Sequence, residues 1–182
     1  MSDKSYTVVA GGAGFLGSHL CKRLVYRGDY VLCVDNLYTG KKSTVSDLND
    51  LENFEFLEKD ITEPLKIDLP IQNIFNLACP ASPFHYQKDP IYTLRVCFEG
   101  SLNLLNLAKD NHVSIFHAST SEIYGDPLVH PQTISYWGNV NPIGIRSCYD
   151  EGKRVAETLF FDFYRTLGID IKVARIFNTY GP

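Results

Sequence analysis

Residues 6–24 read YTVVAGGAGFLGSHLCKRL, and this stretch decides the fold. The segment Tyr6–Ala10 is rich in the β-branched and aromatic side chains typical of a strand, whereas Phe15–Arg27 carries leucines at helical spacing. Three glycines separate the two segments at intervals of three residues: Gly11, Gly14 and Gly17. Glycine permits a tight turn and lets a ligand approach the backbone, and the N–H groups that begin a helix attract anions. The stretch therefore predicts a strand–turn–helix unit that holds a pyrophosphate.

An acidic residue follows the second predicted strand, Tyr30–Val34. Asp35 comes 18 residues after Gly17, where a carboxylate can accept hydrogen bonds from both hydroxyls of a ribose and repels a 2′-phosphate. The glycine turn and Asp35 together predict binding of NAD rather than NADP. The pair Asp60-Ile61 follows the third predicted strand and Leu77 lies near the end of the fourth, so both belong to the sheet edge where cofactors bind.

Short β-rich runs alternate with helical patterns along the chain. The predicted strands are Tyr6–Ala10, Tyr30–Val34, Phe54–Leu57, Ile74–Ala78, Ser114–Ala118 and Ile171–Ile176. Most are separated by lengths that allow a crossover, so we expect an α/β fold: a Rossmann-like, doubly wound parallel sheet flanked by helices. The predicted helices are Phe15–Arg27, Pro90–Asp110 and Tyr149–Leu167. In the second of these, we expect a buried stripe of Leu94, Leu102, Leu105 and Ala108.

Composition bounds the class of protein. A chain of 182 residues with 45% hydrophobic content suffices for one buried core, so we expect a single domain over residues 1–182. The net charge of −4 and the scattered lysines and arginines speak against a nucleic-acid partner. Five widely spaced cysteines without a Cys-x-x-Cys pair indicate reduced thiols and no metal site. Neither a signal peptide nor a membrane span is recognisable, which predicts a cytoplasmic protein without a membrane partner.

A tyrosine and a lysine begin the last predicted helix. Tyr149 and Lys153 are spaced i, i+4, so their side chains share one face. A nearby ammonium and a positive nicotinamide ring favour the phenolate form of tyrosine, which makes it a base for a hydroxyl proton. The run Ala118–Glu122 ends the fifth predicted strand at the same sheet edge and offers hydroxyls and a carboxylate. This juxtaposition predicts an active site and not an exposed helix pair.

Together these features resemble the extended short-chain dehydrogenases/reductases, the NAD-dependent epimerase/dehydratase family, which remodel nucleotide sugars. The resemblance covers essentially all 182 residues and rests on Gly11–Gly17, Asp35, Thr120–Gly125, Tyr149–Lys153 and Arg175–Pro182. Within the family, three longer segments are most similar to UDP-glucuronate decarboxylases (UDP-xylose synthases). They are ACPASPFHY at Ala78–Tyr86, STSEIYGDP at Ser119–Pro127 and YWGNVNPIGIRSCYDEGK at Tyr136–Lys153.

The resemblance implies roles for individual residues. The implied catalytic residues are Thr120, Glu122, Tyr149 and Lys153. The implied NAD-binding residues are Gly11, Gly14, Phe15, Leu16, Gly17, Asp35, Asn36, Tyr38, Thr39, Gly40, Asp60, Ile61, Leu77, Tyr149 and Lys153. The implied contacts to a nucleotide-sugar substrate, UDP-glucuronate in this subgroup, are Ala81, Tyr86, Arg95, Thr120 and Asn178.

The family mechanism, carried onto these positions, begins at C4 of the sugar. Tyr149 takes the proton of the C4 hydroxyl, Thr120 hydrogen-bonds the same oxygen, and hydride passes to NAD. The 4-keto sugar is a β-keto acid, so it can lose carbon dioxide through an enolate without a metal, and Glu122 is implied to assist at C5. Return of the hydride gives a pentose. One departure bears on this site: Cys97 stands where many relatives carry an asparagine, and a thiol is a weaker hydrogen-bonding group.

Three alternatives share parts of this pattern. A dTDP-glucose 4,6-dehydratase uses the same oxidation but needs an acid for its leaving hydroxyl, and relatives of that type carry Thr-Asp-Glu where Thr120-Ser121-Glu122 stands here. A nucleotide-sugar 4-epimerase needs no carboxylate at Glu122. A non-catalytic NAD-binding module has no need of Thr120, Tyr149 and Lys153 together.

The resemblance also bears on extent and assembly. Family members extend well past the Asn-Thr-Tyr-Gly-Pro motif at residues 178–182, so we expect the chain to lack the C-terminal substrate domain.

Relatives dimerise through the equivalents of Pro90–Asp110 and Tyr149–Leu167. The apolar residues Leu102, Leu105, Phe160 and Phe163 exceed what the sheet needs to cover it, and a homodimer is therefore expected.

Overall fold

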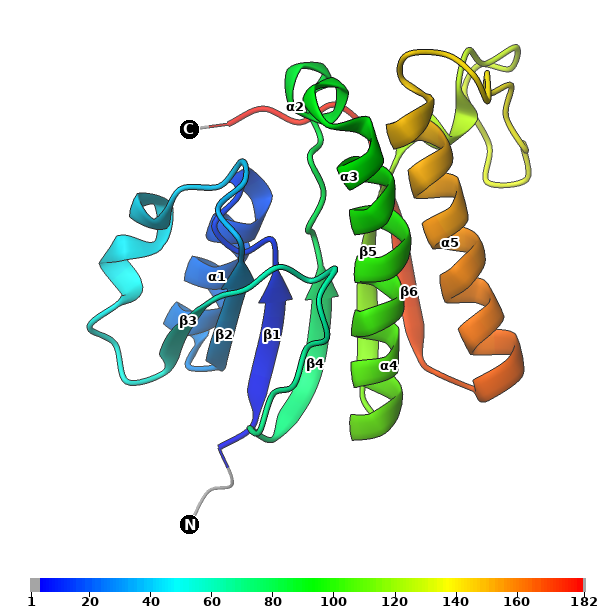
Figure 1. The fold of residues 1–182 in the computed structure, drawn as a ribbon. Helices are drawn as coiled ribbons and strands as arrows, with labels where there is room; N and C mark the ends of the chain where they lie inside the picture. The colour runs from blue at the N-terminus through cyan, green and yellow to red at the C-terminus, as the bar shows by residue number, and fades with distance from the viewer. Residues whose placement is uncertain (1–3, 182) are drawn as a thin grey trace.

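A six-stranded sheet runs through the computed structural model, which describes residues 4–181 (Figure 1). Every strand pair is parallel, and the order is β3-β2-β1-β4-β5-β6. The strands are β1 (Tyr6–Ala10), β2 (Tyr30–Asp35), β3 (Phe54–Glu58), β4 (Ile71–Asn76), β5 (Ser114–Thr120) and β6 (Ile171–Ile176). The prediction of a Rossmann-like α/β fold is confirmed. Residues 1–3 and Pro182, the last residue of the Arg175–Pro182 motif, lie outside the described part.

Side chains of each strand alternate between two apolar layers. Val8 and Ala10 of β1 pack in the cluster that includes Leu104 and Phe160, whereas Val9 packs in the one that includes Cys21 and Leu24. The first layer is covered by α4 (Ser101–Asn111) and α5 (Ser147–Leu167), which stand side by side in front of β5 and β6, and the second by α1 (Phe15–Arg27) (Figure 1). Period-two alternation in a strand thus fixes both layers.

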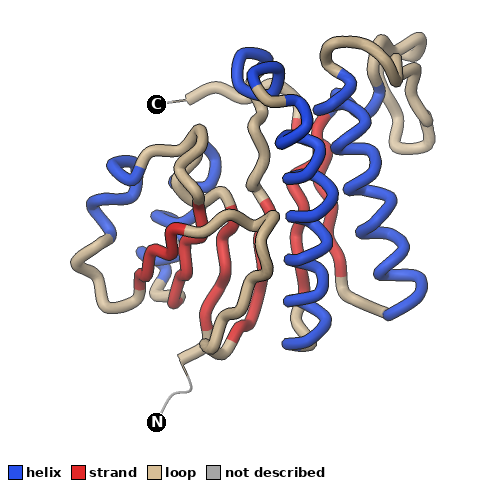
Figure 2. The backbone as a smooth tube through the Cα atoms, in the orientation of Figure 1, coloured by secondary structure: helices blue, strands red, loops and turns tan. Residues whose placement is uncertain are grey.

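The strand order reverses between β1 and β4. The chain leaves β1 toward β2 and β3 on one side, then crosses to β4, β5 and β6 on the other. Open α/β sheets place their ligand site outside the carboxyl ends of the strands at this switch point. The loops that follow β4 and β5 lie at that same end of the molecule (Figure 2).

Most element boundaries differ from the prediction by one or two residues, but β4 differs by more. The predicted strand Ile74–Ala78 is wrong at both ends, because β4 begins at Ile71 and ends at Asn76. Its partner β1 begins at Tyr6, which is paired with Ile71, and ends at Ala10, which is paired with Asn76. Leu77 N–H still donates to the Ala10 carbonyl at 2.9 Å, but the pairing of β4 with both β1 and β5 ends at Asn76.

The predicted helix Pro90–Asp110 is interrupted by one π-helical turn. It consists of α3 (Pro90–Arg95), the π-helix η2 (Val96–Gly100) and α4. The predicted stripe is partly wrong, because Leu94 is 41% exposed and Leu102 is only partly buried, whereas Leu104, Leu105 and Ala108 are fully buried. Gly100 packs closely on the loop after β3, because a Cβ there would lie 2.5 Å from Cδ1 of Ile61.

Three shorter helices were not predicted. They are α2 (Pro83–Lys88) and the 3₁₀ helices η1 (Lys42–Leu48) and η3 (Ser121–Tyr124). Between η3 and α5 the chain forms a long ordered loop, in which Asp126 N–H donates to the Asn139 carbonyl at 3.0 Å and Asn139 N–H donates to the Tyr124 carbonyl at 2.9 Å. Over residues 4–181, none of the helices has both the length and the apolar character needed to cross a membrane.

Candidate active site

A cleft of about 570 Å³ opens at the carboxyl end of the sheet. Its walls come from the glycine turn after β1, the ends of β2, β4 and β5, the start of α5 and the segment after β6. This volume is in the range of small-molecule and cofactor sites. Segments distant in the sequence thus form one site at the switch point of the sheet.

The glycine turn leaves the start of α1 open toward the cleft. Gly14 caps the helix without a side-chain hydrogen bond, and the first helical turn contains no acidic residue. A Cβ at Gly17 would lie 2.0 Å from the Gly11 carbonyl oxygen, so only glycine fits there. Free N–H groups at the positive end of the helix dipole suit a pyrophosphate. The turn fits the phosphates of a dinucleotide.

Asp35 is fixed by the backbone around it. Its carboxylate accepts hydrogen bonds from Ala13 N–H at 2.9 Å and from Leu37 N–H at 2.8 Å, and the residue is only 8% exposed. Gly40, one of the predicted NAD-binding residues, does not line the cleft; it packs behind, where a Cβ would lie 3.0 Å from the Ala13 backbone. Gly40 therefore packs against the backbone of the glycine turn, and the carboxylate of Asp35 lines the cleft.

Asp60 closes the same end of the cleft. It accepts hydrogen bonds from the Tyr92 hydroxyl at 2.7 Å and from the Asn36 amide at 3.0 Å. Although burial alone would raise the pKa of Asp60, hydrogen bonds from Tyr92, Thr62 and Asn36 hold that pKa below its usual value. The aspartate is thus ionised and orders this wall. Tyr92 was not predicted, because only the fold brings it to Asp60.

The predicted pair Tyr149 and Lys153 lies in the first turns of α5 and faces the cleft. Lys153 Nζ donates to the Ala118 carbonyl at 2.7 Å and lies 6.0 Å from the centre of the Tyr149 ring. On its other side, the Tyr149 ring stacks on Tyr86 with centroids 5.0 Å apart and planes 9° from parallel. Both residues are less than 10% exposed. Packing and one hydrogen bond therefore fix the pair.

Burial competes with charge in setting the protonation of this pair. Burial raises the pKa of Tyr149, while Lys153 and a hydrogen bond with Thr120 lower it; the net direction is upward. In the protein alone, desolvation thus outweighs the Lys153 ammonium; the expectation of a favoured phenolate includes the nicotinamide ring and stays a prediction. Burial would lower the pKa of Lys153, but Cys79 and Tyr149 raise it above its usual value, so the lysine stays charged.

Thr120 and Glu122 complete the predicted catalytic group. Thr120 ends β5, and its hydroxyl accepts a hydrogen bond from Glu122 N–H at 3.2 Å, which turns the chain into η3. Glu122 lines the cleft and is ion-paired with Arg146. Burial alone would lower the pKa of Arg146, but Glu122 raises it. Sequence reasoning missed Arg146, although it stands one turn before Tyr149, within the segment that carried the resemblance.

The predicted substrate residues divide into two groups. Ala81, Tyr86 and Asn178 line the cleft, as Thr120 does. Arg95 does not: it is exposed on α3 and its Nε is 2.8 Å from Glu99 one turn later. The prediction for Arg95 is therefore not supported by its position, because the helix turns this side chain toward solvent. The Tyr86 hydroxyl is buried without a hydrogen-bond partner in the protein.

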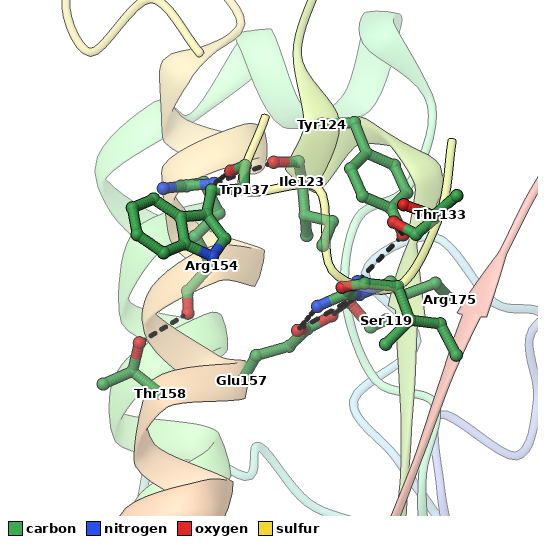
Figure 3. Close-up of polar contacts among 10 residues, drawn as sticks. Ser119, Ile123, Tyr124, Thr133, Trp137, Arg154, Glu157, Thr158 and Arg175 are labelled. Carbon is green, nitrogen blue, oxygen red and sulfur yellow. Dashed lines mark hydrogen bonds and ion pairs between the residues drawn. The ribbon is translucent and has the colours of Figure 1, made fainter. Parts of the chain in front are cut away.

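An ion pair between a buried glutamate and a partly buried arginine, whose side chains are 9% and 23% exposed, anchors the strand that carries Thr120. Glu157 reaches from α5 toward Arg175 on β6, with Oε2 and Nη2 2.8 Å apart (Figure 3). Glu157 also accepts a hydrogen bond from Ser119 at 2.5 Å, and Arg175 donates to the Tyr124 hydroxyl at 2.8 Å. These bonds thus connect α5 and β6 to Ser119, which precedes Thr120, and to Tyr124, which ends η3. No sequence pattern indicated this network.

Comparisons with known proteins agree with this geometry. The model of the NAD dependent epimerase/dehydratase family matches residues 7–182. UDP-glucuronic acid decarboxylase 4 of Arabidopsis thaliana is 54% identical over 175 residues, which cover 96% of this chain and 39% of that protein. This chain therefore spans well under half the length of that relative.

Two solved structures share the fold. A UDP-glucose 4-epimerase of Thermotoga maritima, solved with UDP-glucose, superposes with a TM-score of 0.83 at 28% identity, over 97% of this chain and 57% of its own. The dTDP-glucose 4,6-dehydratase DesIV of Streptomyces venezuelae, solved with NAD and TYD bound, has the same TM-score at 26% identity, again over 97% and 57%. The shared architecture therefore extends to proteins that carry out different reactions.

Proposed function

Because the chain belongs to the NAD-dependent epimerase/dehydratase family, we propose that the full-length protein that carries it decarboxylates UDP-glucuronate to UDP-xylose. The observation that carries the proposal is one constellation: Thr120, Glu122, Tyr149 and Lys153 face a single cleft beside the glycine turn. The 54% identity to a UDP-glucuronic acid decarboxylase supports this reaction among those of the family.

The proposed cofactor is NAD. The open start of α1 would hold its pyrophosphate, and Asp35 would accept hydrogen bonds from the adenosine ribose. When bound, NAD supplies a hydride acceptor at C4 of the sugar and later returns the hydride. The bonds that Ala13 and Leu37 donate to Asp35 keep the carboxylate in position for this contact.

The protein's own residues would move the proton of the C4 hydroxyl. Tyr149 is the base, and Lys153, fixed by the Ala118 carbonyl, stabilises the phenolate that forms when the proton arrives. Thr120 would hydrogen-bond the same sugar oxygen. Stacking against Tyr86 restricts the Tyr149 ring, so the phenol oxygen is already oriented.

Glu122 would act at C5, where carbon dioxide leaves and a proton must return. Its ion pair with Arg146 holds the carboxylate at the cleft wall. The 4-keto sugar loses carbon dioxide as a β-keto acid, so this step needs no metal. The site does need a group that protonates C5 or orders a water molecule there. Glu122 is the carboxylate that η3 places next to Thr120.

Two other reactions of the family use the same oxidation. A dehydratase needs an acid for the leaving hydroxyl, and Ser121, the residue between Thr120 and Glu122, supplies none. A 4-epimerase makes no use of a carboxylate at Glu122. A non-catalytic NAD-binding module would give no turnover despite bound NAD.

Turnover of UDP-glucuronate tests the proposal. The full-length protein is incubated with UDP-glucuronate and NAD, and products are separated and weighed by mass spectrometry. We expect UDP-xylose and carbon dioxide without net consumption of NAD. UDP-glucose and dTDP-glucose serve as the substrates of the alternatives. Turnover of either one with UDP-glucuronate left intact would contradict the decarboxylase, and bound NAD without any product would favour the non-catalytic module.

The choice of cofactor gives a separate prediction. Replacing Asp35 with asparagine should weaken NAD about tenfold, because hydrogen bonds to a charged acceptor are worth more than those to an amide. It should also relax the discrimination against NADP, because the repulsion of a 2′-phosphate disappears. Fluorescence titration with both cofactors measures this, with Asp47→Asn on the exposed helix η1 as the control. An unchanged NAD-to-NADP preference would remove Asp35 from the cofactor site.

Assembly and location remain proposals. Leu105 and Phe160 are fully buried against the sheet, so the sequence-based argument that they are free for a partner is wrong. Apolar residues exposed on the same helices still support a homodimer: Ile91, Leu94, Phe98, Phe161 and Tyr164. Sedimentation of the full-length protein as a monomer at all concentrations would contradict the homodimer.

The free cysteines support a cytoplasmic location, which subcellular fractionation tests.

A further inference from the structure

Two cysteine sulfurs lie in contact beneath the proposed active site. Cys79 follows β4 and lines the cleft, and Cys97 lies in the π-helix η2; their Sγ atoms are 3.5 Å apart. Cys79 is partly exposed, whereas Cys97 is 2% exposed. Cys79 therefore borders the cleft, and the Cys97 sulfur lies against the Cys79 sulfur.

The packing around Cys97 holds the two sulfurs together. A Cβ at Gly152 of α5 would lie 3.0 Å from the Cys97 sulfur, so α5 presses on the thiol without a side chain between them. The π-helical turn places Cys97 on the face that points toward the cleft wall.

The charges around the pair give the two thiols different character. The hydrogen bond between them lowers the pKa of Cys79 and raises that of Cys97. The Lys153 ammonium further lowers the pKa of Cys79 and opposes the desolvation that raises it. A thiolate, and not a thiol, is the reactive form of cysteine. Cys79 is thus the nucleophile and Cys97 the protonated neighbour.

From this geometry we propose that Cys79 and Cys97 form an oxidation site, at which a hydroperoxide reacts with Cys79 and Cys97 then closes a reversible disulfide. The Cys79 thiolate attacks the O–O bond of hydrogen peroxide, giving a sulfenic acid and hydroxide. The Cys97 sulfur attacks the Cys79 sulfur, its proton passes to that hydroxide, and the sulfenic oxygen leaves as hydroxide that takes up a proton to form water. Two thiols are oxidised and one peroxide is reduced to two waters. A dithiol reductant restores the pair.

The disulfide would deform the cleft. A disulfide holds its sulfurs about 2 Å apart, so closure draws the loop after β4 toward η2. That loop contributes six consecutive residues to the cleft, from Leu77 to Ser82. Closure also removes the thiolate whose charge raises the pKa of Lys153. A misplacement of about 1 Å can lower a rate about 10²-fold, and we expect a loss of that order.

The chain contains a matched internal control. Cys21 and Cys33 form a second pair of neighbouring thiols, since a Cβ at Gly12 would lie 2.5 Å from the Cys33 sulfur and 3.1 Å from the Cys21 sulfur, but both residues are 0% exposed. Interaction with Cys21 and burial raise the pKa of Cys33. Neighbouring thiols therefore occur in both places, whereas only Cys79 of these four cysteines lines the cleft. Cys148, whose pKa is raised by burial, is a further nearby thiol.

Peptide mapping tests the site. The reduced full-length protein is treated with hydrogen peroxide, then denatured in N-ethylmaleimide and cut with trypsin. Cys79 and Cys97 fall in different tryptic peptides, residues 67–88 and 96–109. We expect these peptides joined, two hydrogens lighter than their sum, and separated again by dithiothreitol. The peptides of Cys21 and Cys33, residues 5–22 and 28–41, should remain alkylated. A Cys79 that is fully alkylated after peroxide, or joined to Cys148, would overturn the proposal.

Two variants separate the roles of the sulfurs. In Cys97→Ser, Cys79 has no resolving thiol, so a sulfenic acid at Cys79 should be trapped by dimedone and no cross-link should form. In Cys148→Ser, the 67–88 to 96–109 cross-link should form as before. Circular dichroism of both variants checks the fold. Absence of the dimedone adduct in a folded Cys97→Ser protein would contradict Cys79 as the nucleophile, and a cross-linked protein with unchanged turnover would contradict the expected loss of activity.

Discussion

Replacing Tyr149 with phenylalanine is expected to lower turnover about 10²–10⁴-fold, the usual cost of losing a positioned base. The ring still stacks on Tyr86, at 5.0 Å in the structure, and Lys153 keeps its bond to Ala118. Only the hydroxyl is lost, so the fold and cofactor affinity should be retained. Without a base for the C4 proton, neither transient NADH absorbance nor carbon dioxide should form. Stopped-flow absorbance and gas release from the full-length protein measure both.

Glu122→Gln is the matched comparison, because it fails at a later step. The amide keeps the shape of Glu122 but breaks its ion pair with Arg146, and it leaves Tyr149 and Thr120 in place. NADH absorbance should still rise, while decarboxylation or proton return at C5 slows. Two variants that fail equally at NADH formation would refute this division of roles. Unimpaired product formation by Tyr149→Phe would remove Tyr149 as the base.

The second large effect concerns stability. Replacing Arg175 with methionine should lower the free energy of unfolding by about 3 kcal/mol, because removal of one partner from a buried ion pair leaves an uncompensated charge. Glu157 is 7% exposed and would keep only the hydrogen bond from Ser119, and Tyr124 would lose the hydrogen bond that Arg175 donates. Urea denaturation of the full-length protein, followed by tryptophan fluorescence and circular dichroism, measures the change.

An exposed ion pair on the same helix provides the control. Arg165 and Asp162 of α5 lie 2.8 Å apart, but their side chains are 63% and 55% exposed, so Arg165→Met should change stability by less than about 0.5 kcal/mol. Adding Glu157→Gln to Arg175→Met should recover part of the loss, since the double variant removes the unpaired charge. Equal effects at Arg165 and Arg175 would show that burial does not determine the contribution of the pair.

Local sequence determined the parts of this protein that depend on backbone conformation and short spacings. The glycine turn was predictable because Gly17 has no room for a Cβ beside the Gly11 carbonyl. Asp35 was predictable because it directly follows a strand, and Tyr149 and Lys153 because a helix places residues i and i+4 on one face. Each of these features arises within a few residues of one strand or helix, so the order of amino acids carries it directly.

Tertiary structure alone decided which distant side chains meet. Cys79 and Cys97, Glu157 and Arg175, and Tyr92 and Asp60 are each separated by 18 to 32 residues, and no periodicity connects them. Arg95 lies exposed on α3 beside Glu99, and Leu94 lies outside the buried stripe of the helix. Burial likewise raises the pKa of Tyr149 in the protein alone, which no spacing in the sequence predicts. Contact and desolvation depend on how strands and helices pack in three dimensions, and that packing sums many weak interactions over the whole chain.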